Sequence, residues 1–133
     1  MRIVADTSAW IALIRGDGTV AESLLANAIT SHQILVPDLI RYEILRCMQN
    51  EEQAKKFTKT LDKFESVVVG GVRLATIAAA NYRKLRAKSI TVRGSIDLLI
   101  GTWCIENEIP VLHQDRDYDF IEKQLGLRIW RGE

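Results

Sequence analysis

The chain has 133 residues, of which 47% are hydrophobic and 26% are charged, and its formal net charge at pH 7 is +1. This length and hydrophobic content predict one globular domain over residues 1–133 and argue against a disordered chain. The near balance of charge excludes a global positive field that would attract nucleic acid or an anionic membrane, so a polyanion would need local basic groups.

The apolar stretches of the sequence do not fit a membrane protein. The longest, IDLLIGTWCI, is about half as long as a bilayer requires, and it contains Asp97. Asp6 and Arg15 break the apolar run near the amino terminus, which argues against a signal peptide. We therefore expect a cytoplasmic protein with no membrane partner.

Short apolar runs alternate with helical patterns along the chain. Asp38 and Ser95 are suitable amino-terminal caps, and Gly126 is a suitable carboxyl-terminal cap. The expected elements are, in chain order, a strand at 2–5, helices at 8–15 and 19–29, a strand at 34–37, helices at 38–49 and 51–66, a strand at 67–71, helices at 72–88 and 95–107, a strand at 109–113, a helix at 117–126 and a strand at 127–130.

This alternation predicts an α/β fold with a central, mainly parallel sheet of about five short strands flanked by helices. In such sheets the functional crevice lies beyond the carboxyl ends of the strands. Asp6 ends the first expected strand, and Asp115 and Asp117 follow the fourth. We therefore expect these three carboxylates to lie at one end of the sheet.

Two further acids lie where a solvated carboxylate is not expected. Glu43 lies four residues after Leu39 and four before Cys47, and so shares the apolar face of its helix. Asp97 lies in the first turn of the most apolar helix, among apolar neighbours. Both side chains are expected to point inward, where they have little water.

Each acid, taken alone, also has a structural explanation. Asp6, Thr7 and Ser8 are all good amino-terminal caps, and Asp97 suits the positive end of a helix dipole. Glu43 has Arg46 and Arg83 as candidate partners for an ion pair. Asp115 or Asp117 is a suitable cap for the last helix.

The five acids together are harder to explain without a cation. Carboxylates that converge at one end of a sheet repel one another strongly unless a positive charge lies between them. Ligand sets made only of oxygen atoms suit Mg²⁺ or Mn²⁺, and such an ion can activate water and offset charge on a phosphodiester. The acids therefore predict nuclease chemistry.

Cysteine and histidine do not predict a metal site of their own. Cys47 and Cys104 lie far apart within apolar helical patterns, which favours reduced thiols in the core over a disulfide or a zinc site. Neither His32 nor His113 belongs to a cluster with zinc-ligand spacing. We expect His32 in a loop or at the surface, and His113 at a strand end near the crevice.

Four segments resemble, in order and over nearly the whole chain, a PIN domain of the VapC type of toxin ribonuclease. They are VADTSAWIALI, PDLIRYEILR, SIDLLIGTWC and VLHQDRDYDFI. The resemblance implies a single PIN-like domain with a three-layer fold. It also implies an endoribonuclease that depends on Mg²⁺ or Mn²⁺, is usually a homodimer, and is paired with a VapB antitoxin whose tail covers the active site.

By position, the resemblance implies a catalytic quartet of acids: Asp6, Glu43, Asp97 and Asp115. Asp6, Asp97 and Asp115 are the expected metal ligands, while Glu43 positions a second ion or a water. Asp117 is a further candidate ligand, and either Asp115 or Asp117 is the closer one.

Residues beside these acids complete the expected site. Ser8 resembles the small hydroxyl residue that supports the first aspartate, and Thr7 is a weaker match. Tyr118 stands where the family often has Phe, a change that we expect to leave the packing intact. Four arginines near the motif segments are candidates for binding RNA phosphates, although surface arginines are more often only solvated charges. They are Arg15, Arg41, Arg93 and Arg116.

Other classes of protein share parts of this pattern. A phosphoacceptor receiver domain needs an Asp after its third strand, where this chain has Gly70 and Gly71. A glycosidase needs a sugar cleft, and little aromatic surface lies near the acids. A PIN-like module that binds a partner protein or RNA without cleaving it stays the main competing hypothesis, because metal-site residues can persist in an interaction protein.

Overall fold

A sheet of four parallel strands, in the order β3-β2-β1-β4, lies at the centre of the computed structural model, which describes residues 1–132. Every neighbouring pair of strands runs parallel. This confirms an α/β fold with a parallel sheet. The strands are β1 (Arg2–Ala5), β2 (Gln33–Pro37), β3 (Glu65–Val67) and β4 (Val111–Leu112).

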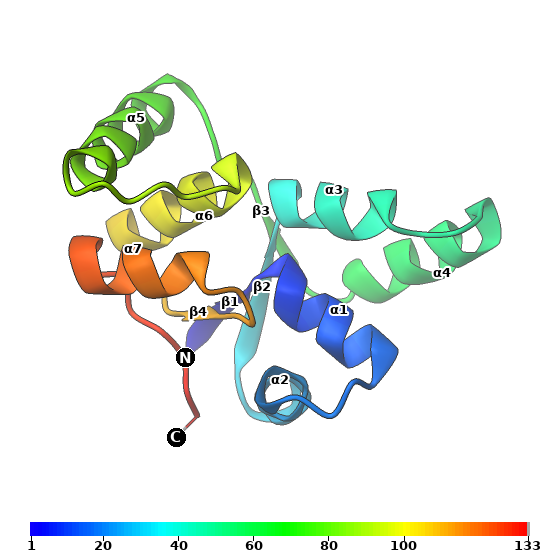
Figure 1. Cartoon of the computed structure of the whole chain (residues 1–133). Helices are drawn as coiled ribbons and strands as arrows, with labels where there is room; N and C mark the ends of the chain where they lie inside the picture. The colour runs from blue at the N-terminus through cyan, green and yellow to red at the C-terminus, as the bar shows by residue number, and fades with distance from the viewer. Residues whose placement is uncertain (133) are drawn as a thin grey trace.

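Seven helices flank the sheet within residues 1–132. They are α1 (Thr7–Arg15), α2 (Val20–Ser31), α3 (Asp38–Arg46), α4 (Glu51–Leu61), α5 (Val72–Ala87), α6 (Ser95–Glu106) and α7 (Asp117–Leu125). Figure 1 shows α5, α6 and α7 gathered on one side of the strands and α1 to α4 on the other, which gives the three layers. None of these helices combines the length and the apolar character needed to cross a bilayer.

The centre of the core is formed by β1 and α6. Residues 3–5 of β1 have no exposed surface, because helices cover both faces of a parallel sheet. Helix α6 is apolar almost all round, as the sequence predicts, and Ile100 in its middle has no exposed surface either. These two elements also carry the buried acids, since Asp6 follows β1 directly and Asp97 lies in the first turn of α6.

Three expected strands differ clearly in the structure. The strand expected at 109–113 is limited to Val111–Leu112. Residues 127–130 form one parallel bridge, between Val111 and Ile129, so the expected fifth strand is wrong. The third strand begins at Glu65, two residues earlier than expected, because its register with β2 pairs Glu65 with Leu35. The helix before it, expected to reach residue 66, ends at Leu61. The apolar run that suggested a strand at 67–71 therefore lies mostly outside the sheet.

The acid at the start of α3 is not the expected cap. Asp38 is the first residue of the helix, and Pro37 occupies the cap position. The Asp38 carboxylate Oδ1 accepts hydrogen bonds from the backbone N–H groups of Leu39 and Val69, both at 2.9 Å. The bond from Val69 ties the loop after β3 to the start of α3.

Other expectations about helix ends have mixed outcomes. Ser95 is the first residue of α6 and Gly94 occupies its cap position, so the expected Ser95 cap is wrong. Gly126 ends α7 in the left-handed region with φ +81°, which confirms its role as a carboxyl-terminal cap.

Both cysteines are free, but only Cys104 is buried. Cys47 follows the last residue of α3 and is exposed, so its expected position in the core is wrong.

Removing the Asp38 carboxylate should loosen the attachment of the loop after β3. We expect Asp38→Ala to lower the free energy of unfolding by about 1 kcal/mol, since the backbone N–H of the buried residue Val69 loses its acceptor. Asp38→Asn keeps an acceptor oxygen and should lose less than half of that. Urea unfolding followed by circular dichroism measures both variants, and equal stability of Asp38→Ala and the wild type would contradict the role given to this bond.

Candidate metal centre

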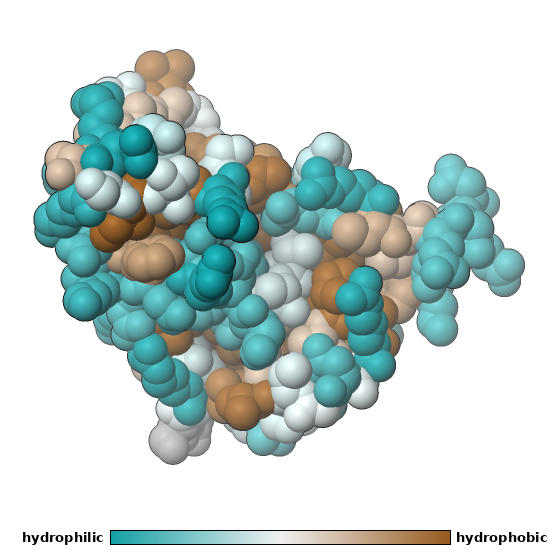
Figure 2. Space-filling view, in the orientation of Figure 1, coloured by the Kyte–Doolittle hydropathy of each residue, from teal (hydrophilic) through white to brown (hydrophobic). Residues whose placement is uncertain are grey.

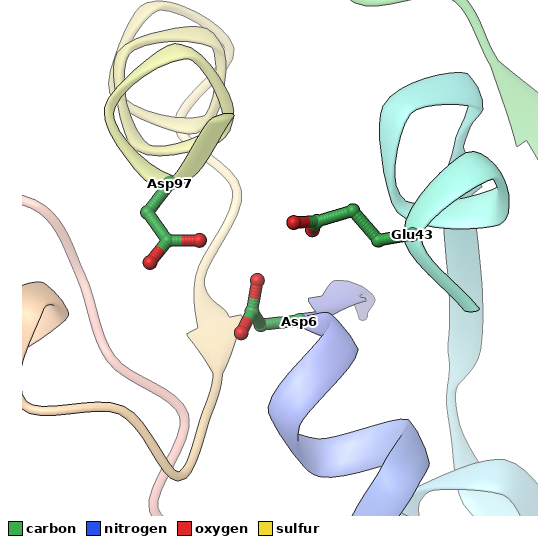
Figure 3. Close-up of side chains that lie close together, drawn as sticks. All are labelled: Asp6, Glu43 and Asp97. Atoms are coloured by element: carbon green, nitrogen blue, oxygen red, sulfur yellow. The ribbon is translucent and has the colours of Figure 1, made fainter. Parts of the chain in front are cut away.

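Acidic side chains from separate parts of the chain meet beside the carboxyl end of β1. Asp6 is the cap residue of α1, with the extended backbone angles φ −68° and ψ 161°. Glu43 belongs to α3 and Asp97 to α6. Figure 3 shows the three carboxylates turned toward a common point between the three helices. The parallel strands therefore deliver the acids to one end of the sheet, as the sequence predicts.

The carboxylates form two overlapping groups. Oxygen atoms of Asp6, Glu43 and Asp97 lie within 4.8 Å of one another, and so do oxygen atoms of Asp97, Asp115 and Asp117. Asp97 is common to both groups. Asp6 is 2% exposed, Asp97 8% and Asp117 7%. The structure thus brings together all five acids singled out in the sequence.

These acids line an open pocket of ≈ 540 Å³. The other lining residues are Thr7, Ser8, Arg93, Gly94 and Arg116. Figure 2 shows that hydrophilic residues cover much of this face between the two groups of helices. The pocket is open to solvent, and half of its lining residues are acidic.

Asp6 is held through both of its carboxylate oxygens. Oδ2 accepts a hydrogen bond from the Ser8 hydroxyl at 2.8 Å and another from the Ser8 backbone N–H at 3.1 Å. The Ser8 hydroxyl in turn accepts from the backbone N–H of Gln114 at 2.9 Å. Oδ1 accepts from the Tyr118 hydroxyl at 2.8 Å. Asp6 therefore caps α1 and is also fixed in the pocket.

Thr7 lies against a different acid from the one expected. Its hydroxyl donates to Glu43 Oε1 at 2.7 Å rather than to Asp6. The other oxygen of Glu43 is 3.9 Å from Arg46 Nη2, so the ion pair considered from the sequence exists only at long range. Glu43 is thus directed into the pocket mainly by a neutral donor.

The two acids after β4 brace the backbone around them. Asp117 Oδ2 accepts from the backbone N–H groups of Arg93 and Gly94, at 3.1 and 3.3 Å. Asp115 Oδ1 accepts from the backbone N–H of Asp117 at 3.0 Å. Arg116 occupies the cap position of α7 and makes no side-chain cap bond, so neither aspartate is the expected cap. Both acids keep an oxygen within reach of Asp97, and both stay candidate ligands.

The position of Asp97 depends on the residue before its helix. A Cβ atom on Gly94 would lie 2.8 Å from Asp97 Oδ2, so a larger residue here would displace the Asp97 carboxylate. Burial, together with the nearby charges of Asp6 and Asp115, raises the pKa of Asp97 to about 8. Without a cation, this carboxylate resists ionisation at neutral pH.

The histidines do not add ligands to these groups. His113 lies at the end of β4, as expected, where its Nδ1 accepts from the backbone N–H of Asp115 at 3.1 Å. Burial lowers the pKa of His113, which favours the neutral ring. His32 packs edge-on against Trp130, with ring centroids 4.8 Å apart. In residues 1–132, the groups able to hold a cation consist of carboxylates alone, a donor set that fits Mg²⁺ or Mn²⁺.

The four arginines named from the sequence separate into two pairs. Arg93 and Arg116 line the pocket. Arg41 pairs with Asp62 at 2.7 Å and does not line it. Arg15 lies in the last turn of α1, about 13 Å along the helix from the end that carries Asp6. Only the first two are placed to contact a ligand in the pocket.

The Tyr118 hydroxyl is the contact that sequence reasoning missed. Tyr118 has no exposed surface, and burial raises the pKa of its phenol well above the ordinary value, so the group stays a donor. The expectation that Tyr for Phe affects only packing is incomplete, because the extra hydroxyl binds Asp6. The one available signal was a polar aromatic residue directly after an acid at the start of a helix.

Comparisons with known proteins give consistent matches. The family model described as the PIN domain matches residues 3–124. A VapC ribonuclease of Mycobacterium bovis and ribonuclease VapC11 of Mycobacterium tuberculosis are each 27% identical to this chain over 128 residues, covering 95% of this chain and 96% of theirs.

Solved structures match over the same extent. A chain from the complex VapBC2 of Rickettsia felis, bound to a DNA fragment from its promoter, has a TM-score of 0.73, 15% identity and full coverage of both chains. A chain from VapBC-1 of Haemophilus influenzae has a TM-score of 0.75 and 14% identity, with 98% of this chain and 97% of that chain covered. At these identities the match concerns the fold alone.

The raised pKa of Asp97 makes the stability of the metal-free protein depend on pH. Because folding favours the protonated acid, its contribution is complete below the ordinary pKa of 3.8 and is lost as the pH rises through about 8. We expect the melting temperature in EDTA to fall by about 5 °C between pH 5.5 and 8.5. Asp97→Asn should remove most of that fall, and a wild-type melting temperature that does not change over this range would contradict the raised pKa of Asp97.

Proposed function

Since this chain belongs to the PIN domain family, we propose that it is a metal-dependent endoribonuclease and the toxin of a toxin-antitoxin pair. Its reaction is the hydrolysis of phosphodiester bonds in RNA. The observation that carries the proposal is the pair of overlapping carboxylate groups that share Asp97. The names of the mycobacterial relatives support the choice of RNA as substrate.

The residues that would hold the ion are the buried acids. Asp6 and Asp97 would bind Mg²⁺, or Mn²⁺ in its place, together with Asp115 or Asp117. A divalent ion at this position supplies a Lewis acid that activates water and offsets charge on the phosphate. Because Asp97 belongs to both carboxylate groups, the site could hold a second ion, with Glu43 among its ligands.

Glu43 would be the residue that accepts a proton from the attacking water. The Thr7 hydroxyl holds one of its oxygens at 2.7 Å, and the side chain is 15% exposed. Its carboxylate can therefore orient a water molecule in the pocket and accept a proton from it. This gives Glu43 a role distinct from that of the more deeply buried aspartates.

Arg93 and Arg116 are the groups that would bind the RNA backbone. An acidic pocket repels phosphate, and the chain as a whole carries a net charge of only +1. Both arginines line the pocket, and neither side chain forms a salt bridge within residues 1–132. They are therefore free to bind the phosphates on either side of the scissile bond, while bases contacted elsewhere determine the choice of RNA.

The proposed toxin role includes a protein partner. Titles of the matched structures describe VapBC complexes, which supports a VapB-type antitoxin as the partner of this chain. We extend the proposal to a homodimer and to the cytoplasm, where its RNA substrate is found.

Light scattering of the purified protein should give twice the mass of one chain, and a monomer at micromolar concentration would contradict the homodimer.

RNA cleavage by the purified chain tests the proposed activity. We expect cleavage with Mg²⁺ or Mn²⁺ and none with EDTA. Asp97→Asn should lower the rate by more than about 100-fold, the upper end of the effect seen for residues that only support a metal ligand. Glu52→Gln, which changes an exposed acid in the first turn of α4, is the matched control and should keep the wild-type rate.

Two results would contradict the proposal. Cleavage that persists in EDTA, or that survives Asp97→Asn, would separate the activity from the carboxylates. Failure to cleave any RNA pool, together with no Mn²⁺ binding by calorimetry, would favour a PIN-like interaction module. In that case Asp6 would be a helix cap with no catalytic role.

A further inference from the structure

One buried hydrogen bond joins the two halves of the candidate metal centre. The Tyr118 hydroxyl donates to Asp6 Oδ1 at 2.8 Å, although the residues are 112 positions apart. Asp6 follows β1, whereas Tyr118 lies in the first turn of α7, next to Asp117. The bond therefore fixes the end of β1 against the segment that supplies the last acids of the site.

The surroundings of Tyr118 direct its hydroxyl to this one acceptor. The side chain has no exposed surface, so water does not compete for the bond. Its ring packs against the His113 ring, with centroids 5.0 Å apart and planes inclined at 32°. A phenylalanine ring would fill the same space, and the two residues differ at this position only by the hydroxyl group.

The bond matters because the charges of neighbouring acids repel Asp6. Carboxylate oxygens of Glu43 and Asp97 lie within 4.8 Å of it, and each of these neighbours repels Asp6 whenever it is ionised. Ser8 holds Oδ2 from one side and Tyr118 holds Oδ1 from the other. With a donor on each oxygen, the carboxylate cannot rotate without breaking a hydrogen bond.

We propose that Tyr118 is a positioning residue of the metal centre, which holds Asp6 in place for the cation before the cation binds. The inference rests on the proposed function, because it requires a divalent ion between these carboxylates. Groups that orient a metal ligand change metal affinity by about 10–100-fold. The contribution of the Tyr118 hydroxyl should therefore appear in the affinity for the ion itself, without any RNA.

Calorimetric titration with Mn²⁺ alone tests this role in the full chain. We expect Tyr118→Phe to raise the dissociation constant for Mn²⁺ about tenfold. Tyr82→Phe removes the hydroxyl of a tyrosine that is 42% exposed on α5, and it should bind Mn²⁺ as the wild type does. A purely structural role predicts a lower melting temperature for Tyr118→Phe with unchanged Mn²⁺ affinity, and that result would overturn the proposal.

A double-mutant cycle shows whether Tyr118 acts through Asp6. Asp6→Ala removes the acceptor of the Tyr118 hydroxyl and leaves the carboxylates of Asp97, Asp115 and Asp117 in place for Mn²⁺, so a weakened affinity stays measurable. In that background, Tyr118→Phe should cause little further loss. A second tenfold loss there would show that the hydroxyl acts on another part of the site, which contradicts the proposal.

The same titration separates failure of this inference from failure of the proposed function. Wild-type protein that binds Mn²⁺ with an affinity equal to that of Tyr118→Phe would overturn the positioning role alone. Wild-type protein that binds no Mn²⁺ would overturn the metal centre, and the role of Tyr118 with it.

Discussion

Repulsion among buried carboxylates is the constraint on which the rest of the site depends. At Asp97, burial is the larger cause and the charges of Asp6 and Asp115 add to it, and together they raise the pKa to about 8. The chain opposes this repulsion mainly with neutral donors, and among the described residues the one salt bridge to these acids is the long contact of Arg46 with Glu43. Neutral donors fix the carboxylates without cancelling their charge, so the pocket keeps its attraction for a cation. These donors are the hydroxyls of Thr7, Ser8 and Tyr118 and the backbone N–H groups of Ser8, Arg93, Gly94 and Asp117.

The fold supplies the rigidity that such an arrangement needs. Parallel strands end at the same edge of the sheet, so acids placed after β1 and β4 meet although they are far apart in sequence. Burial of β1 and α6 in the core fixes the backbone on which Asp6 and Asp97 depend. Figure 1 shows the helices in two groups around this edge, and the pocket is lined by residues from both. The site is therefore built from several elements, each of which is held by the hydrophobic core.

The sequence was sufficient to predict what depends on periodicity and strand ends. The alternation of strands and helices predicted the parallel sheet, and the apolar surroundings of Glu43 and Asp97 predicted that these acids point inward. Contacts between distant segments could not be predicted, because no local pattern shows that Tyr118 reaches Asp6 or that Gly94 must make room for Asp97. The third strand was misplaced for a similar reason, since pairing with β2 rather than local apolarity determines where it starts.

Anomalous X-ray scattering from crystals grown with MnCl₂ is the most direct test of the central claim that these carboxylates form one divalent-metal centre. We expect an anomalous peak near the manganese absorption edge between Asp6 and Asp97, within bonding distance of a carboxylate oxygen from each. Asp97→Asn crystals grown in the same way should lose that peak or show it strongly weakened. Ordered carboxylates with no peak among them at saturating Mn²⁺ would contradict the account, as would a peak only at surface acids outside the pocket.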